Sequence, residues 1–371
     1  MTRKLLSGVA FAAMLGVAAP AAAQIKMGVG GPITGSAAAF GAQLKMGVEQ
    51  AVEDINAAGG INGKKISVEV GDDASDPKQG ISVANKFVGD GVTWVVGHFN
   101  SSVSIPTSGV YNENGVLQIT PASTNPNLTN PDPKTGESKW NVFRTCGRDD
   151  QQGAVAADYL AKHFKDKKIA FIHDKKAYGK GLVDETKKAM NALGLKEVLY
   201  DTINPGEKDY SAIVSKLKAA GADLVYYGGE HTEAGLIVRQ MREQGMDTQL
   251  ISGDALVTDE YWGITGEAGA GTLMTFAPDP TKFAAAKAVV DKFKAKGINP
   301  EGYTLYTYAA MKIWADAANA AGSTDLEAIT AKLNGTSYET VLGPIAFDAK
   351  GDVTEASYVW YIWKDGKYGE M

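Results

Sequence analysis

Apolar and polar residues along the chain follow two alternating periods from residue 25 onward. Short apolar runs of the kind that form buried strands are predicted at residues 25–31, 66–70, 93–97 and 116–120. Helical spacing of apolar residues separates these runs at residues 38–58 and 78–88, and a further helix is predicted to open at Ser101. Strands that alternate with helices of this length predict a parallel sheet with helices on both faces.

The same pattern then restarts. A polar loop at residues 130–138 comes before the second series, and residues 272–276 follow it as a passage back to the first half. Strands are predicted at residues 168–173, 197–201, 224–228 and 249–252, helices at 181–192, 210–219, 232–244, 283–295 and 304–321, and late strands at 344–347 and 358–363. The fold class is therefore α/β, with two doubly wound parallel-sheet lobes.

The first residues have the pattern of a secretory signal. Arg3 and Lys4 precede an apolar run at residues 5–19, and three small residues then end in Ala23. The run is too short to anchor the chain across a bilayer, so we expect cleavage after Ala23 and export to the periplasm. The alternative is a short N-terminal helix packed on the domain. No other apolar run of about 18 residues occurs, which predicts a soluble mature protein.

Charge and cysteine content exclude some classes of function. The chain has 37 basic and 43 acidic residues, and loss of Arg3 and Lys4 with the signal leaves 35 basic residues. This acidic balance argues against nucleic acid and anionic membrane surfaces as partners. The single cysteine, Cys146, is predicted to be a buried structural thiol; the alternative is a nucleophile supported by Arg148.

Candidate binding residues follow the strands, because ligands of such sheets bind outside the carboxyl ends of the strands. In the first half these are Gly97 to Ser102 and Thr120 to Asn125, and in the second half Asp174 to Tyr178, Gly228 to Glu230, and Gly253-Asp254. The first set offers hydroxyls and backbone amides, and the second set offers carboxylates and a tyrosine. This division suits a zwitterion, with a carboxylate at the helix that Ser101 opens and an ammonium group at Asp254.

Each of these residues also has a simpler interpretation. Ser101 is then only a helix N-cap, and Thr124 and Asn125 are ordinary turn residues. Asp254 is then the cap of the next helix, and Tyr178 only packs.

Catalytic patterns do not emerge from the sequence. The four histidines, His98, His163, His173 and His231, are scattered and lack metal-ligand spacing with cysteine. No Walker A sequence and no Gly-x-Ser-x-Gly elbow occurs, and Ile33 stands where a dinucleotide fingerprint beginning at Gly28 needs its third glycine. We therefore predict a binding protein that is not an enzyme and that uses no cofactor and no metal.

Several segments together resemble the branched-chain amino-acid (Leu/Ile/Val)-binding proteins, the type I periplasmic binding proteins of ABC transporters. The resemblance covers about residues 25 to 363. It is carried by residues 71–79 (Gly-Asp-Asp-Ala-Ser-Asp-Pro-Lys-Gln), 84–86, 119–122 (Ile-Thr-Pro-Ala), 173–179, 206–210 (Gly-Glu-Lys-Asp-Tyr), 226–229 and 342–344.

The resemblance implies a Venus-flytrap whose lobes are joined by a three-segment hinge and close on an L-amino acid. The implied lobes are residues 24–144 with 277–356, and residues 145–276 with 357–371. Ser101 and the Thr124 backbone would hold the α-carboxylate, and the Ala122 carbonyl, the Thr124 hydroxyl and Asp254 would hold the α-ammonium. The side-chain pocket would be formed by Phe40, Phe99, Asn100, Tyr178, Glu230 and Tyr303.

Departures from the family pattern bear on the ligand. Asp254 stands where the family commonly has Glu, and the archetype's disulfide matches Ser75 and Asn100, so that bridge is absent. Phe99 and Tyr303 are bulky, which favours small or branched aliphatic amino acids, in a range that includes alanine, valine, proline and short ω-amino acids. Glu230 is expected to face solvent or pair with a lysine; the alternative is direct contact with a cationic or hydroxylated ligand, which keeps basic amino acids among the candidates.

The partners implied are a small amino acid and the permease subunits of an ABC importer in the inner membrane, with the chain itself a monomer. A periplasmic sensor of the same fold that signals to a membrane receptor is the alternative.

Overall fold

The computed structural model describes residues 24–371 except 133 and 137. The predicted signal peptide and its cleavage after Ala23 lie outside the described residues. Among those described, no helix is long and apolar enough to cross a membrane.

The first sheet has five parallel strands in the order β2-β1-β3-β4-β5. The strands are β1 (Ile25–Gly31), β2 (Ile66–Asp72), β3 (Trp94–Gly97), β4 (Leu117–Thr120) and β5 (Val142–Arg144). The helices around them are α1 (Ala38–Ala57), α2 (Pro77–Gly89), α3 (Ser101–Glu113), α10 (Thr304–Ala321) and α11 (Leu326–Leu333). The strand order reverses direction between β1 and β3, which is the usual place for a ligand in such a sheet.

The second sheet has seven strands in the order β14-β13-β10-β9-β8-β6-β7. Its parallel strands are β6 (Ile169–His173), β7 (Leu199–Thr202), β8 (Leu224–Gly228), β9 (Gln249–Ser252) and β10 (Leu273–Phe276). Strand β13 (Val359–Lys364) pairs antiparallel with β10, and β14 (Lys367–Glu370) pairs antiparallel with β13 at the edge of the sheet. Its helices are α4 (Asp149–His163), α5 (Ala177–Ala192), α6 (Ser211–Ala220), α7 (His231–Glu243) and α8 (Glu260–Thr265).

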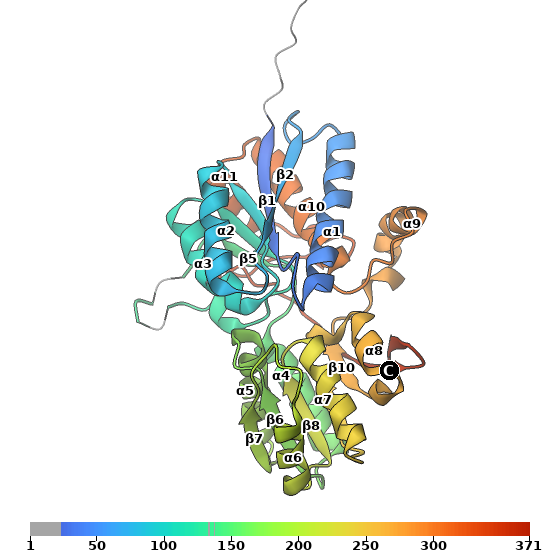
Figure 1. Ribbon diagram of the computed structural model, residues 1–371. Helices are drawn as coiled ribbons and strands as arrows, with labels where there is room; N and C mark the ends of the chain where they lie inside the picture. Colours follow the sequence, from blue (N-terminus) through green and yellow to red (C-terminus); the bar gives the residue numbers. More distant parts are fainter. Residues whose placement is uncertain (1–23, 133, 137) are drawn as a thin grey trace, which may run out of the picture.

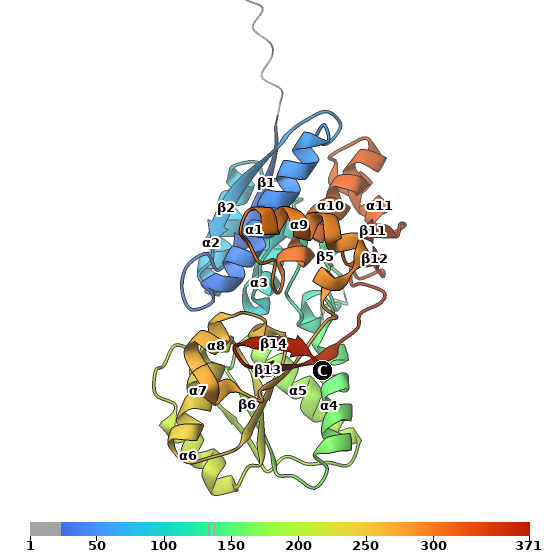
Figure 2. The same ribbon diagram turned by 90° about the vertical axis from the view of Figure 1, so that its right-hand side faces the viewer.

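The two sheets belong to two lobes, which Figure 1 shows one above the other, with the first sheet in the upper lobe. Figure 2 shows the C-terminal strands β13 and β14 in the lower lobe, although α10 and α9 (Lys287–Ala295) lie above them. The chain therefore passes between the lobes three times: after β5, after β10 and before β13. The exact boundaries predicted at residues 144, 276 and 356 stay predictions.

Local sequence signals explain where helices begin and end. Asp76 is the N-cap of α2, and its carboxylate accepts from the backbone N–H groups of Lys78 and Gln79, each at 2.8 Å. Pro77 follows at the first helical position, where its missing N–H is harmless. Helix α10 ends at Gly322, whose φ of 62° lies in the left-handed region that favours glycine.

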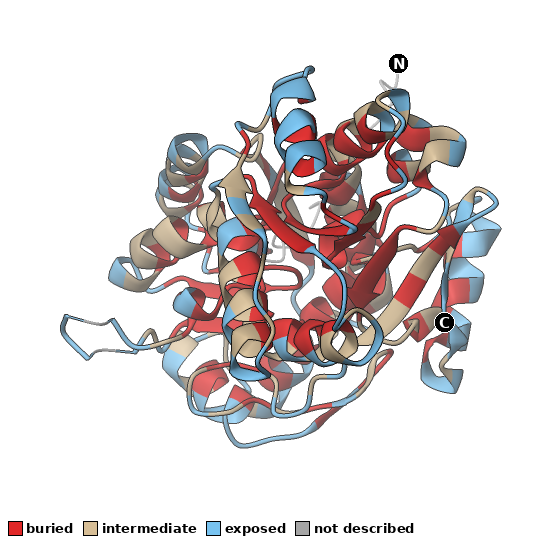
Figure 3. Cartoon of the chain, turned by 90° about the horizontal axis from the view of Figure 1, so that it is seen from below, coloured by how far each residue is buried: buried red, intermediate tan, exposed pale blue. Residues whose placement is uncertain are grey.

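The core of each lobe lies between its sheet and its helices. Figure 3 shows buried strands surrounded by helices whose outer faces are exposed. In the upper lobe, Trp94 of β3 stacks on Trp314 of α10 with ring centroids 4.1 Å apart, and both are buried. This contact joins a late helix to an early strand, so the upper lobe is made from two distant parts of the chain.

Most predicted elements are confirmed, but the short elements β5, α8, α11, β11 (Tyr338–Thr340) and β14 were not predicted, nor was the longer helix α4. Helix α4 was not predicted, because its buried positions include Gln152, Ala156 and Ala157, which give only a weak hydrophobic period. The late strand expected at residues 344–347 is β12 (Gly343–Ile345), which pairs only with β11 (Tyr338–Thr340) in a separate two-stranded sheet.

A buried ionic cluster lies where the chain leaves the upper lobe. The guanidinium of Arg144, at the end of β5, is fully buried and lies 2.7 Å from Asp352, and Arg148 lies 2.5 Å from the second oxygen of Asp352. Burial raises the pKa of Asp352, but the neighbouring charges of Arg144 and Arg148 outweigh it and lower the pKa to about 2. The cluster thus links the crossing after β5 to the crossing before β13 by buried ion pairs.

Candidate functional site

A small cavity of about 200 Å³ lies where the two lobes meet. It is lined by Phe99, Asn100, Ser101, Ala122, Tyr178, Glu230, Asp254 and Ala255. The upper lobe supplies the residues after β3 and β4, and the lower lobe supplies the starts of α5 and α7 and the residues after β9. Figure 1 shows α3 in the upper lobe, above α5 and α7 of the lower lobe. Seven of the ten predicted residues line the cavity.

Ser101 is the first residue of α3, and its hydroxyl oxygen accepts from the backbone N–H of Asn125 at 3.2 Å. The cap position is held by Asn100, so the simpler interpretation of Ser101 as the N-cap is wrong. Because the first N–H groups of a helix have no partner within it, the start of α3 favours an anion at this wall of the cavity.

Thr124 lies just behind the wall that Ala122 forms. Its carbonyl oxygen accepts from the backbone N–H of Asp149 at 2.9 Å, and its hydroxyl lies beside the Asp149 carboxyl. Thr124 does not line the cavity itself, whereas Ala122 does. The turn between β4 and β5 therefore lines the cavity with Ala122 and directs the Thr124 side chain toward Asp149 of the lower lobe.

Asp254 forms the opposite wall. Its carboxylate accepts from the hydroxyl of Tyr178 at 3.0 Å and from the hydroxyl of Tyr303. Burial raises the pKa of Asp254, and the hydrogen bond from Tyr303 offsets part of that rise. Asp254 opens the 3-10 turn Asp254–Leu256 after Gly253, which holds the cap position, so the interpretation of Asp254 as a helix cap is wrong.

Aromatic rings close one side of the cavity. Phe99 lines the cavity, and Phe40 of α1 stacks behind it with centroids 4.3 Å apart. Tyr303 meets Phe99 edge-on at 5.6 Å. Phe40 and Tyr303 thus support Phe99 and Asp254 instead of lining the cavity, and the packed rings leave little room for a long side chain.

Glu230 is buried at the N-cap position of α7, with 3% of its surface exposed. Its Oε1 accepts from Nδ2 of Asn100 across the lobes at 2.8 Å. The expectation that Glu230 faces solvent or pairs with a lysine is therefore wrong. Burial raises the pKa of Glu230 to about 8.

Two further polar residues near Asp254 were missed. Asp149 is fully buried, and burial followed by the charge of Asp254 raises its pKa well above the ordinary value. Gln152 donates to the hydroxyl of Thr275 at 2.9 Å and also contacts Asp254. Both residues belong to α4, and this helix was not predicted because its hydrophobic period is weak. Only the polar character of Asp149 and Gln152 could have indicated a role at the site.

Other clusters of polar residues lie away from this cavity. His98 bridges Asp73, at 2.6 Å, and Tyr111, at 3.0 Å, in a fully buried network of the upper lobe. Cys146 is free and buried, as predicted, and burial raises the pKa of its thiol. Among the described residues, no group of three or more His, Cys, Asp or Glu side chains is arranged to hold a metal.

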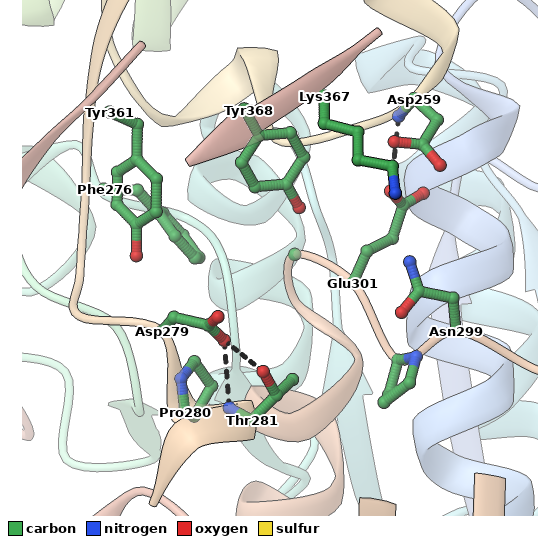
Figure 4. A pocket seen from close by; sticks show the side chains of 12 residues that line it. Asp259, Phe276, Asp279, Pro280, Thr281, Asn299, Glu301, Tyr361, Lys367 and Tyr368 are labelled. Atoms are coloured by element: carbon green, nitrogen blue, oxygen red, sulfur yellow. Dashed lines mark hydrogen bonds between the residues drawn. The ribbon is translucent and has the colours of Figure 1, made fainter. Parts of the chain in front are cut away.

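A larger cavity of about 780 Å³ lies beside β10, β14 and residues 299–302. Figure 4 shows Glu301 accepting from the backbone of Asp259 and Asp279 accepting from Thr281, with Tyr361 and Tyr368 along its wall. Burial raises the pKa of Glu301 to about 7. None of the ten predicted binding residues lines this cavity, and it does not join the two sets of groups that suit a zwitterion.

Comparisons with known proteins agree with this architecture. Residues 24–367 match the family described as periplasmic binding protein. The chain is 52% identical to Leu/Ile/Val-binding protein homolog 1 of Brucella abortus over 99% of both chains, and 49% identical to an amino acid binding protein of Pseudomonas aeruginosa over 100% of this chain and 98% of that protein.

Two solved structures have the same fold. The leucine binding protein LivK of Thermotoga maritima superposes with a TM-score of 0.85 at 27% identity, covering 94% of this chain and 97% of that one. LivJ of Streptococcus pneumoniae, solved in complex with isoleucine, gives 0.83 at 27% identity, covering 93% and 98%. The two parallel-sheet lobes, the cavity between them and these likenesses lead to one assignment. The chain belongs to the periplasmic binding protein family, in its Leu/Ile/Val-binding group.

Proposed function

We propose that this protein is a periplasmic receptor that binds a small L-amino acid between its lobes and delivers it to an ABC importer. The observation that carries the proposal is that Ser101, at the start of α3 in the upper lobe, and Asp254, after β9 in the lower lobe, line the same cavity. A helix N-terminus attracts a carboxylate, and a buried carboxylate attracts an ammonium group. An amino acid carries both groups on one carbon.

The main-chain groups of the ligand are assigned as follows. The Ser101 hydroxyl and the Thr124 backbone hold the α-carboxylate. The Ala122 carbonyl oxygen and Asp254 hold the α-ammonium, and the Thr124 hydroxyl, which lies beside Asp149, joins them by turning toward the cavity when the ligand binds. Tyr178 and Tyr303 keep the Asp254 carboxylate in place through their hydroxyls. No catalytic role is assigned to any of these residues.

Similar proteins support the proposal, because their names refer to leucine, isoleucine, valine or amino acids in general. The proposed ligands are smaller than leucine, because Phe99 and its stacked partner Phe40 fill space beside the cavity. Export with cleavage after Ala23, hinge closure between the lobes and a monomeric state complete the proposal.

The direct test measures binding of the twenty common L-amino acids to the mature chain by thermal shift and then by calorimetry. A ligand that binds the native state raises the unfolding temperature by mass action. At least one small amino acid is expected to bind with micromolar affinity or better, near −8 kcal/mol. A panel in which no amino acid binds would refute the proposal.

Delivery to an importer is tested in cells. Deletion of the gene is expected to abolish high-affinity uptake of the ligand identified by calorimetry. The alternative, a sensor on the same fold, predicts unchanged uptake and loss of a chemotactic or transcriptional response.

A further inference from the structure

Two buried polar side chains from opposite lobes meet at the cavity. Asn100 precedes α3 in the upper lobe and Glu230 precedes α7 in the lower lobe, and each has 3% of its surface exposed. Both line the cavity, and Nδ2 of Asn100 donates to Oε1 of Glu230 at 2.8 Å. This hydrogen bond uses one acceptor of the carboxyl and one donor of the amide.

The remaining acceptors of the pair have no partner among the described residues. Oε2 of Glu230 and Oδ1 of Asn100 are both buried and form no hydrogen bond there. Oδ1 of Asn100 is an acceptor, whereas Oε2 of Glu230 is an acceptor when the carboxyl is ionised and a donor when it carries the proton that its raised pKa favours. Buried polar atoms in native proteins nearly always have partners, so these two atoms call for a group from outside the chain that donates to Asn100 and can bond Glu230 in either state, as a hydroxyl can.

The charged neighbours of Glu230 do not remove this need. Asp174, Glu233 and Asp254 act on it with like charge, and Lys176 is the cation that favours its charged form. No ion pair joins Lys176 to Glu230 in the part of the chain that the structure describes. The carboxyl therefore lacks a direct donor other than Asn100.

The position of Asn100 and Glu230 in the cavity determines which part of a bound amino acid they contact. Ser101 and Asp254 are assigned to the main-chain groups of an amino acid, which leaves Asn100 and Glu230 to face the side chain. The cavity is about 200 Å³, and the stacked Phe99 and Phe40 rings limit its extent. A donor that reaches the pair must therefore sit on a short side chain.

We infer that Glu230 and Asn100 determine specificity for an L-amino acid whose short side chain carries a hydrogen-bond donor, such as the hydroxyl of threonine or serine. This inference rests on the proposed function. It narrows the ligand from small aliphatic amino acids to those that supply the missing donor. An aliphatic ligand would leave both oxygen atoms buried and unpaired, and sites built around polar groups reject such analogues strongly.

The test compares threonine with valine, which have nearly the same shape and differ by a hydroxyl in place of a methyl group. Calorimetry on the mature chain near neutral pH is expected to give threonine a Kd at least about tenfold lower than that of valine. The short diamine 2,4-diaminobutyrate is a third ligand, and if it binds still more tightly, the preferred donor is charged.

Variants connect the preference to the pair. Glu230→Leu is expected to remove the advantage of threonine and to bring valine to equal or tighter binding. Glu243→Gln, an exposed carboxylate on the same helix, is the matched control and leaves both affinities unchanged. If Glu230→Leu does not fold, Glu230→Gln replaces it. This variant keeps an acceptor for Asn100 but cannot carry a negative charge. Its affinity for 2,4-diaminobutyrate is expected to fall more than its affinity for threonine.

The outcomes separate this inference from the proposed function. Equal or tighter binding of valine by the wild type overturns the inference and leaves amino-acid binding intact. Equal weakening of threonine and valine by Glu230→Leu also overturns it, because Glu230 then only joins the lobes. Failure of every amino acid to bind refutes the proposed function itself.

Discussion

The hydroxyl of Tyr303, in the upper lobe, donates a hydrogen bond to the carboxylate of Asp254, in the lower lobe. The same carboxylate accepts from Tyr178 of its own lobe at 3.0 Å. Asp254 is thus held from both lobes at once. A group that orients the proposed ammonium partner also links the lobes, so ligand binding and lobe closure share one set of hydrogen bonds.

Replacement of Asp254 by alanine should weaken binding of the amino-acid ligand by about 2–5 kcal/mol, because the ammonium group loses its desolvated countercharge. Isothermal calorimetry with the best ligand measures this. Asp259→Ala, an exposed carboxylate nearby, serves as the control. Unchanged affinity in Asp254→Ala would show that the ammonium group lies elsewhere.

Tyr303→Phe removes the hydroxyl between the lobes and leaves the ring in place. Hydrogen bonds to charged groups contribute about 1.5–3 kcal/mol, so ligand binding should weaken by that amount. Small-angle scattering of the variant at low ligand concentration should show a larger radius of gyration than the wild type, since fewer contacts favour closure. Tyr306→Phe, in the first turn of the helix that Tyr303 caps, is expected to behave as the wild type in both measurements.

Phe99→Leu should improve binding of leucine relative to alanine. The substitution removes ring volume beside the cavity, and overpacking of a long side chain against that ring costs about 1–3 kcal/mol. Competition calorimetry with alanine, valine and leucine on the wild type and the variant measures the change. A wild type that binds leucine about tenfold more tightly than alanine and valine would contradict the small-cavity argument.

Stability should depend on pH through Glu230. Because burial raises its pKa to about 8, the folded protein keeps a proton that the unfolded chain releases near pH 4 to 5. The free energy of unfolding therefore falls as pH rises from about 4 to about 8 and levels off above that. Glu230→Gln removes this dependence. The Tm of the variant minus the Tm of the wild type should therefore increase as pH rises from about 5 to about 8. A constant difference in Tm over this range would exclude Glu230 as the source.

Asp352 has the opposite dependence. Its pKa is lowered to about 2 between Arg144 and Arg148, so its contribution to stability is complete above about pH 4 and is lost as pH falls through about 2. Asp352→Asn leaves the buried guanidinium of Arg144 without a full countercharge, and a loss of about 3–5 kcal/mol in unfolding free energy is expected from urea titration. Glu355→Gln, which is exposed in the same segment, should change stability by less than about 0.5 kcal/mol.

Much of the fold could be predicted from the sequence because the strands are short, apolar and regularly spaced. Helix α4 could not, since Gln152, Ala156 and Ala157 fill buried positions that usually hold larger apolar residues. The positions of Ser101 and Asp254 followed from the rule that ligands lie beyond the carboxyl ends of parallel strands.

Contacts between distant residues set the limit of such prediction. The partner of Glu230 is Asn100, 130 residues earlier in the chain, and Tyr303 reaches Asp254 from a helix that follows a crossing between lobes. Neither pairing has a local sequence signal. The preference for Glu230 facing solvent was wrong because a carboxylate is normally exposed, and only the fold shows it covered by the opposite lobe.

The three crossings between the lobes have a consequence for how the protein is made. Strand β10 pairs on one side with β13 (Val359–Lys364), which comes long after it in the chain. During synthesis this edge of Leu273–Phe276 stays unpaired until residues 359–364 have been added, and an unpaired strand edge is a template for aggregation. Loss of residues 359–371 by truncation or proteolysis should therefore expose the edge of β10 and promote self-association through it.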